Sequence, residues 1–244
     1  MNIIELKTID STNRYLKNLI HTDTQLPNFL TVFTPQQTAG VGQYGAKWQT
    51  EPYMNLTFST LFIPNNLSIE NAFLLNMIVP ITILKTLKEM NITEEINIKW
   101  PNDVIMAHKK IGGILIENIL KGHQIIKSVI GIGLNVNQTN FENLPKASSL
   151  KKIIGNNFDI KLLMKCIVTN LEDTLSTLST ASFEDIYNEY KNYLFRNEKV
   201  STFSLPDGTH FMGIIKGTTH TGELIVATEK STQTFSLKQI ELLY

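Results

Sequence analysis

The stretch INIKWPNDVIMAHKKIGGILIEN, residues 96–118, predicts the central part of the fold. Its first residues, 96–100, are typical of a strand, and this strand ends at the turn-forming sequence Pro-Asn-Asp at 101–103. The apolar runs at 104–106 and 111–118 then have the spacing of two strands paired in a hairpin. We therefore expect neighbouring strands of one sheet here, with polar side chains at the end of the first strand.

Strands and helices alternate on both sides of this stretch. Short apolar segments predict strands, and apolar residues at helical spacing predict helices. The predicted strands are 2–9, 30–34, 55–62 and 125–136. The predicted helices start at Ser11 or Thr12, at Ser68 (68–90, which Pro80 should kink or divide), at 160 (160–178) and at 182 (182–194). This order indicates an α+β fold, a mixed β-sheet with helices packed on one face.

The last part of the chain has a different pattern. Between 199 and 244, five short strand-like runs are separated by turn sequences such as Pro206-Asp207-Gly208 and Thr221-Gly222. This spacing is typical of a small β-barrel. We therefore expect two domains, 1–196 and 197–244.

The composition excludes several classes of protein. With 22 basic and 22 acidic residues among 244, the chain has no net field that would draw it to nucleic acid or to an anionic membrane. The single cysteine, Cys166, cannot form an intramolecular disulfide. The start of the chain lacks the apolar core of a secretory signal, and no uncharged apolar run approaches the ~18 residues that span a bilayer. A cytoplasmic protein is predicted.

Two segments carry groups that suit anion binding. The glycines of the loop 40–45 let backbone N–H groups approach a phosphate or carboxylate, although such glycines are also common in ordinary loops. Lys99 and Asp103 place a cation and a carboxylate at a strand end, which suits phosphate and Mg²⁺. The alternative for this turn is that Asn102 and Asp103 cap their own backbone.

Three other residues have two interpretations each. Trp48 is either a core side chain or a cover for a flat ring beside a mobile loop. Lys110, just before a glycine pair, either enters a closed site or lies solvated at the hairpin. Asn135, at the end of another predicted strand, either contacts a ligand or satisfies a turn. The five histidines show no metal-ligand spacing and no Ser/His/Asp order stands out, so zinc and triad chemistry are unsupported.

The order of five motifs resembles that of the biotin protein ligase family over nearly the whole chain. The motifs are Ser11-Thr12-Asn13, the glycine loop from Gln36 to Trp48, Lys99 to Asp103, Lys110 to Glu117, and Gly131 to Asn135. The resemblance implies the fold of that family, a catalytic domain like those of class II synthetases and biotin or lipoate ligases, followed by a small SH3-like β-barrel.

The resemblance also implies an activity. Enzymes of this family join biotin to ATP with release of pyrophosphate, and then transfer biotin from biotinyl-5'-AMP to a lysine of a biotin carboxyl carrier protein or domain. Biotin, ATP and Mg²⁺ would be substrates and activator, with no tightly bound prosthetic group. The monofunctional type is expected, because the ten residues before Ser11 leave no room for an N-terminal DNA-binding domain. A homodimer is left open.

By the same resemblance the motif residues take three roles. The expected catalytic residues are Lys110, Lys99 and Asp103, with Asp103 as a ligand of Mg²⁺. The residues expected to bind biotin are Ser11, Thr12, Asn13, Gln37, Gly40, Val41, Gly42, Gln43, Lys110, Gly112 and Gly113. The residues expected to bind the nucleotide are Gly40, Gly42, Lys47, Trp48, Lys99, Asn102 and Asn135.

The glycine loop departs from the family in one respect. Many members carry several arginines there, whereas Lys47 is the only cation between 40 and 47. We therefore expect weaker retention of the adenylate, unless Tyr44 stacks on a ring and loop closure does the holding. Two other functions stay open, namely a lipoate or octanoate ligase or transferase of the same fold, and a non-catalytic protein that retains a biotin pocket.

Overall fold

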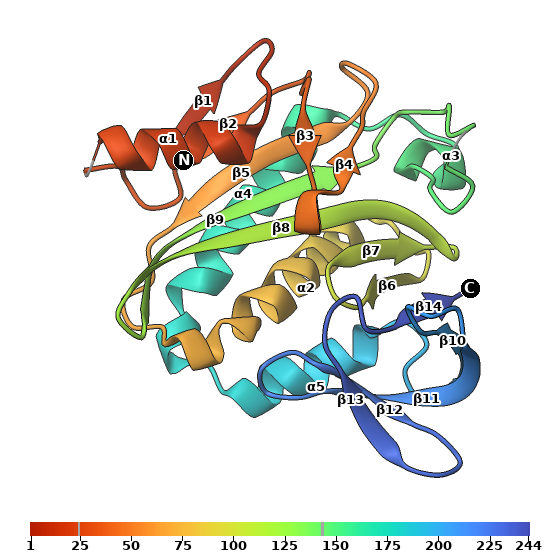
Figure 1. Ribbon diagram of the computed structural model, residues 1–244. Coiled ribbons are helices and arrows are strands. Elements are labelled where there is room, and N and C mark those ends of the chain that lie inside the picture. Colours follow the sequence, from red (N-terminus) through yellow and green to blue (C-terminus); the bar gives the residue numbers. More distant parts are fainter. Residues whose placement is uncertain (24, 143) are drawn as a thin grey trace.

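A seven-stranded sheet forms the centre of the computed structural model, which describes residues 1–23, 25–142 and 144–244 (Figure 1). The strand order is β1-β2-β5-β9-β8-β7-β6. The strands are β1 (Ile3–Glu5), β2 (Thr31–Phe33), β5 (Leu56–Phe62), β6 (Ile96–Lys99), β7 (Asp103–Met106), β8 (Lys109–Lys121) and β9 (Gln124–Leu134). β1 and β2 are parallel, whereas the other neighbouring pairs are antiparallel, so the sheet is mixed as predicted.

The stretch 96–118 forms three neighbouring strands. Lys99 of β6 lies opposite Asp103 of β7, and Asp103 in turn lies opposite Gly113 of β8. The chain turns from β7 to β8 through Ala107 and His108, which both have positive φ, at 48° and 59°. That backbone conformation matches the right-handed twist of a hairpin. The hairpin therefore brings a lysine, an aspartate and a glycine side by side at one end of the sheet.

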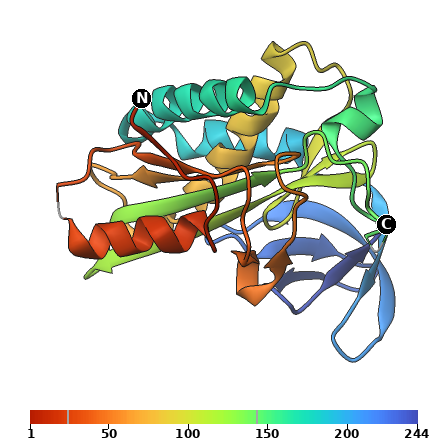
Figure 2. The ribbon, with the colours of Figure 1, turned by 90° about the horizontal axis from the view of Figure 1, so that it is seen from above.

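Helices cover both faces of the sheet. The longer helices are α1 (Thr12–Thr22), α2 (Phe73–Glu89), α4 (Ile160–Ser176) and α5 (Phe183–Tyr193), with short helical segments η1 (Gln43–Gly45), η2 (Ile69–Asn71), α3 (Leu150–Ile154) and η3 (Leu178–Thr180). α2 and α4 pack on one face, and α1 lies on the opposite face (Figure 2). This differs from the predicted single helical face. The difference arises because Leu61 of β5 packs against Leu16 of α1, while Phe58 of the same strand joins the larger core.

The helix ends agree in part with prediction. Ser11 caps α1 as expected, because its hydroxyl accepts the backbone N–H of Arg14 at 3.4 Å. Pro80 lies inside a single helix, α2, and the break in this segment comes earlier, at Ala72 between η2 and α2. The segment Ile69–Glu89 is long and apolar enough to cross a membrane, but 67% of its most apolar window is buried inside the protein, as in a core helix.

A small antiparallel sheet of five strands follows α5, as the turn spacing predicted. Its strands, in the order β13-β12-β11-β10-β14, are β10 (Val200–Ser204), β11 (His210–Thr218), β12 (Leu224–Ala227), β13 (Thr232–Phe235) and β14 (Glu241–Leu243). Phe203 and Ile215 belong to the same hydrophobic core as α2. The indole N–H of Trp100 donates to the carbonyl of Gly222 at 2.8 Å. These contacts hold the small sheet against the end of β6, next to Lys99.

Candidate active site

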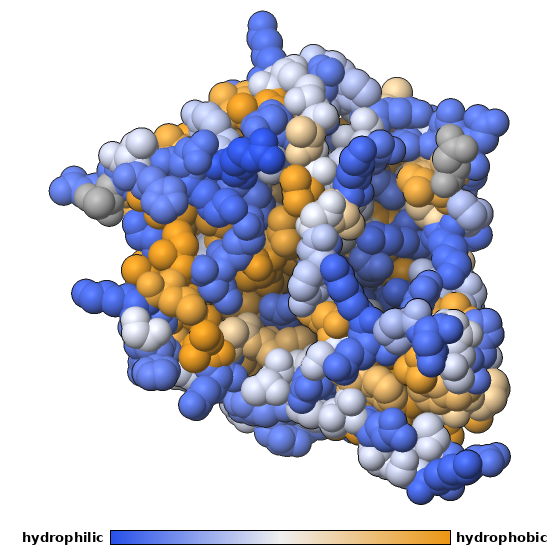
Figure 3. Space-filling model, viewed as in Figure 1, coloured by the Kyte–Doolittle hydropathy of each residue, from blue (hydrophilic) through white to orange (hydrophobic). Residues whose placement is uncertain are grey.

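One cavity of about 590 Å³ lies between the large sheet, the start of α1, the turn after β6 and the small sheet. A two-stranded hairpin, β3 (Gly40–Val41) and β4 (Lys47–Trp48), stands over it. Figure 3 shows the hollow beside this hairpin, with hydrophobic residues on its floor. The predicted site residues that line the cavity are Ser11, Thr12, Asn13, Gln37, Val41, Gly42, Gln43, Lys47, Trp48, Lys99, Asn102, Asp103, Lys110 and Gly113.

The floor of the cavity is built from glycines of β8 and β9. Gly113 and Gly133 are paired across the two strands, and Gly131 follows on the same face because side chains alternate along a strand. A Cβ atom on Gly133 would lie 2.4 Å from Cε2 of Trp48, and one on Gly131 would lie 2.1 Å from Oδ1 of Asn13. The indole ring and the amide therefore rest directly on the floor. Gly131 and Gly133 were not among the predicted site residues, although their spacing of two in a strand was a usable signal.

One end of the cavity presents neutral hydrogen-bonding groups. The backbone N–H and the hydroxyl of Thr12 both donate to Oε1 of Gln37, at 2.9 and 3.3 Å. Because Oε1 already accepts, the Nε2 group of Gln37 is left as a donor, and it lies against Gly40. Ser11 accepts the N–H of Arg14, so its own proton is available to a ligand. This end therefore offers a hydroxyl donor and an amide donor close together.

The other end is positively charged. Nζ of Lys110 lies 2.6 Å from Oδ1 of Asp103, and Nζ of Lys99 lies 4.0 Å from Oδ2. The side chains of Lys99 and Asp103 are 18% and 14% exposed, and that of Lys110 is 35% exposed. Burial lowers the pKa of Lys99 from 10.5, and the charge of Asp103 opposes this shift. The charges of Glu241 and Lys146 also act on Lys99, so three lysines face two carboxylates here, and the net positive charge suits an anionic ligand.

The hairpin above the cavity meets the small sheet through Tyr44. This residue has a positive φ of 55° and is 61% exposed, and Nζ of Lys238 lies 4.6 Å from the centre of its ring. Lys238 also lines the cavity, so it adds a second cation near the glycine loop, whose own residues 40–47 include a single cation, Lys47. It was missed in the sequence because it comes from the segment between β13 and β14. The buried Nε1 of Trp48 has no hydrogen-bond partner within the described parts of the chain.

Three predicted site residues do not line the cavity. Gly40 lies behind Gln37, where a Cβ atom would be 2.4 Å from Nε2 of that side chain. Gly112 faces the other side of β8, where a Cβ atom would meet the side chain of Leu134 at 2.4 Å. The amide of Asn135 donates to the carbonyl of Ser148 at 2.9 Å. In this structure Asn135 thus holds a neighbouring loop, which was the alternative interpretation of its position.

The donor set around Asp103 fits a metal ion only in part. No group of three or more His, Cys, Asp or Glu side chains that could hold a metal occurs in residues 1–23, 25–142 and 144–244. Mg²⁺ is commonly bound by one or two carboxylates together with phosphate oxygens and water. Asp103 therefore suits a Mg²⁺ ion that enters already bound to phosphate.

Comparisons with known proteins show which family the chain resembles in sequence and fold. Residues 5–135, just over half of the chain, match the sequence profile of the biotin/lipoate A/B protein ligase family. The chain is 25% identical over 249 residues to the bifunctional ligase/repressor BirA of Bacillus spizizenii, covering 99% of this chain and 74% of that protein. It is 30% identical over 135 residues to BirA of Escherichia coli, covering 55% of this chain and 40% of that protein. The structure is similar to biotin protein ligase from Aquifex aeolicus in complex with biotin and ATP, with a TM-score of 0.80, 26% identity, and coverage of 99% and 98% of the two chains.

Proposed function

The chain belongs to the biotin/lipoate A/B protein ligase family, and on this premise we propose that it is a biotin protein ligase. It activates biotin with ATP to biotinyl-5'-AMP and transfers the biotinyl group to a lysine of a biotin carboxyl carrier protein or domain. The observation that carries the proposal is a single cavity with neutral hydrogen-bonding groups at one end and two lysines at the other. This arrangement matches a molecule with a ureido ring at one end and a carboxylate at the other.

The neutral end favours biotin over lipoate. A ureido ring has one carbonyl oxygen and two N–H groups, so its carbonyl can accept from the hydroxyl of Ser11 and from Nε2 of Gln37. The dithiolane ring of lipoate has neither group and would leave these donors unpaired. A buried polar group without a partner costs about 1–3 kcal/mol, so each unpaired donor disfavours lipoate.

The charged end suits adenylate formation. The carboxylate of biotin has to attack the α-phosphate of ATP, and the two anions repel each other unless fixed cations hold them together. We assign Lys110 to the biotin carboxylate, Lys99 to the phosphates and Asp103 to the Mg²⁺ that enters with ATP. Asn102 and Trp48 contact the nucleotide, with the indole ring of Trp48 packed on adenine after the hairpin closes.

The transfer of biotin to the carrier requires less catalysis by the enzyme than adenylate formation does. The neutral amine of the acceptor lysine attacks the acyl carbonyl of biotinyl-5'-AMP, a C–N bond forms, and the C–O bond to AMP breaks. The amine proton leaves to solvent, and AMP departs as a stable anion. Positioning of the amine in line with the activated carbonyl is the main requirement.

We also propose that the protein has two domains and acts in the cytoplasm. Residues 1–196 form the catalytic domain, and residues 197–244 form a second domain that contributes Lys238 and Glu241 to the cavity. We expect a cytoplasmic protein whose macromolecular partner is the carrier protein or domain, with no role for nucleic acid or membrane. The even balance of 22 basic and 22 acidic residues supports this expectation.

The test is a reaction of the protein with Mg·ATP, biotin and a biotin carboxyl carrier domain, followed by mass measurement of the carrier. We expect the carrier to gain the mass of one biotinyl group and pyrophosphate to be released only when biotin is present. The matched control replaces biotin by lipoate, which should yield no modified carrier. Biotin binding without pyrophosphate release would instead support the non-catalytic alternative, and modification by lipoate would support the lipoate ligase alternative.

A further inference from the structure

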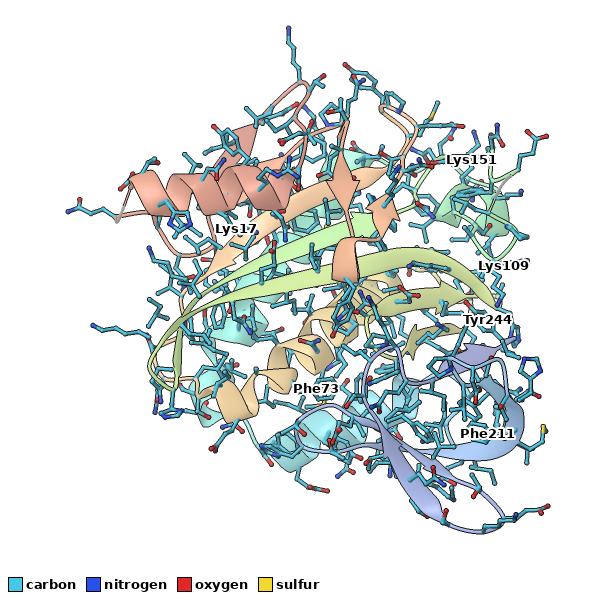
Figure 4. The ribbon with its side chains drawn as sticks, in the orientation of Figure 1. Lys17, Phe73, Lys109, Lys151, Phe211 and Tyr244 are labelled. Carbon is cyan, nitrogen blue, oxygen red and sulfur yellow. The ribbon has the colours of Figure 1, made fainter. Side chains whose placement is uncertain are left out.

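The carboxylate of Glu117 ties helix α1 to strand β8. Nζ of Lys17 lies 2.6 Å from Oε1 of Glu117, and Nδ2 of Asn13 lies 2.9 Å from Oε2. Lys17 and Asn13 are four residues apart in α1 and so lie on the same face of the helix. Figure 4 shows Lys17 between this helix and the sheet. Each oxygen of the carboxylate therefore accepts a hydrogen bond from one residue of the same helix.

This contact determines which way the amide of Asn13 faces. An ionised carboxylate can only accept hydrogen bonds, so Asn13 has to present Nδ2 to Glu117 and Oδ1 to the opposite side. A weaker contact of 3.4 Å from Nδ2 to the carbonyl of Leu115 has the same direction. On the other side, the fully buried hydroxyl of Ser59 donates to Oδ1 at 2.5 Å. The amide is therefore held from both sides in a single orientation.

The acceptor oxygen of Asn13 is available to a ligand. Oδ1 rests on the glycine floor, where a Cβ atom on Gly131 would lie 2.1 Å away. A carbonyl oxygen has two lone pairs, and Ser59 uses one of them. The second is left for a group in the cavity, which both Asn13 and Gly131 line. Oδ1 thus completes the neutral end with an acceptor, beside the two donors from Ser11 and Gln37.

We propose that Glu117 is a positioning residue that turns the amide of Asn13 into a hydrogen-bond acceptor and so makes the cavity select a ring with an N–H donor. The inference rests on the proposed function and adds a determinant of its specificity. Glu117 is absent from the described residues that line the cavity, so it acts through Asn13 and not by touching the ligand. A ureido ring supplies the N–H group that this acceptor requires.

A purely structural role for Glu117 makes a different prediction. If the carboxylate only fastened α1 to β8, its loss would weaken the binding of every ligand of the cavity by a similar factor. If the carboxylate orients Asn13, its loss would weaken the binding only of ligands that donate an N–H group. The ratio of affinities for two ligands that differ in this group therefore separates the two roles.

The experiment measures binding of biotin by calorimetry to the wild type, Glu117→Met and Glu117→Gln. Methionine has a similar length but no acceptor oxygen, and we expect about tenfold weaker binding of biotin, the loss of about one hydrogen bond. Glutamine can turn its own amide oxygen toward Asn13, so its affinity should stay within about threefold of the wild type. Lys17→Met is the matched control, because it removes the ion pair with Glu117 but leaves the contact to Asn13, and it should bind biotin within about twofold of the wild type.

The second arm uses an analogue of biotin in which both ureido N–H groups are replaced by oxygen, a cyclic carbonate. We expect the wild type and Glu117→Met to bind this analogue within about twofold of each other, since it has no proton for Asn13 to accept. An equal loss for biotin and the carbonate, or no loss for biotin in a folded Glu117→Met protein, would overturn the inference. Should Glu117→Met fail to fold, Glu117→Leu, which also has no acceptor oxygen, carries the same comparison. Failure of the wild type to bind biotin would overturn the proposed function as well.

Discussion

Asp103→Asn is expected to separate biotin binding from adenylate formation. The ammonium group of Lys110 lies 2.6 Å from Oδ1 of Asp103, so the lysine assigned to the biotin carboxylate is already paired with a carboxylate of the protein. Asp103 therefore competes with the carboxylate of biotin for the charge of Lys110. Asparagine has nearly the same size without the charge, so the substitution removes this competitor and also removes the proposed ligand of Mg²⁺.

The size of the effect on binding follows from the geometry. Two unit charges 2.6 Å apart attract each other by about 6 kcal/mol at an effective dielectric constant of about 20. The Lys110 side chain is 35% exposed, and solvent screening with the entropy of holding a lysine reduces such a pair to about 1 kcal/mol. Biotin should therefore bind Asp103→Asn about fivefold more tightly than the wild type. Adenylate formation should slow by at least about tenfold, because the carboxylate proposed to hold Mg²⁺ is lost.

Calorimetry with biotin alone measures the first effect, and pyrophosphate release at saturating biotin and Mg·ATP measures the second. Glu241→Gln is the matched control, because Glu241 also lines the cavity but forms no ion pair with Lys99 or Lys110 among the described residues. Its affinity for biotin should change less than about twofold. Weaker biotin binding by Asp103→Asn would show that Asp103 supports the biotin site and does not compete with it, and would refute the reasoning.

Four other substitutions test the site. Lys110→Ala should lower the rate of adenylate formation by about 10²–10³-fold, measured as biotin-dependent pyrophosphate release, because it removes the cation assigned to the biotin carboxylate. Burial lowers the pKa of Lys99, so its ammonium group is charged at low pH and loses its charge as the pH rises through a value below 10.5; KM for ATP should therefore rise at a lower alkaline pH in the wild type than in Lys99→Arg, which stays charged. Gly133→Ala should push the ring of Trp48 off the floor, lowering the free energy of unfolding by about 1–3 kcal/mol in a denaturant titration and shifting the tryptophan emission to longer wavelength. Lys238→Met should release biotinyl-5'-AMP about threefold faster in a single-turnover assay, and an unchanged rate would exclude Lys238 from retention of the adenylate.

The strands and long helices were predictable because their patterns are local. The hairpin around 107–108 and the start of α1 at Ser11 follow from turn and capping residues that act over four or five positions. The helix α3, Leu150–Ile154, was not predicted, because five residues are too few to show a helical period. The burial of β5 on both faces was also missed, since it depends on α1 folding back over a strand some forty residues later.

The residues that line the cavity could be predicted in part from the sequence, whereas their contacts could not. Motif spacing identified Lys99, Asp103 and Lys110, and the structure brings these three together. Nothing in the sequence places Lys238 near the glycine loop, because that contact depends on how the small sheet docks against the end of β6. Nor does a motif show that Asn135 turns away from the cavity toward a neighbouring loop.

The direction of hydrogen bonding in the cavity is the property that sequence alone cannot supply. Asn13 and Gln37 each carry a donor and an acceptor, so either could present N–H or C=O to a ligand. The first backbone N–H groups of a helix have no partner within the helix. The N–H group of Thr12 donates to Oε1 of Gln37, so Gln37 can present only its Nε2 donor to a ligand. The carboxylate of Glu117 accepts a hydrogen bond from Nδ2 of Asn13, so Asn13 presents its acceptor oxygen to a ligand. The pattern that a ureido ring would meet is therefore set by a helix terminus and by a carboxylate outside the cavity, and a change at Glu117 would alter ligand choice while every residue that lines the cavity stayed the same.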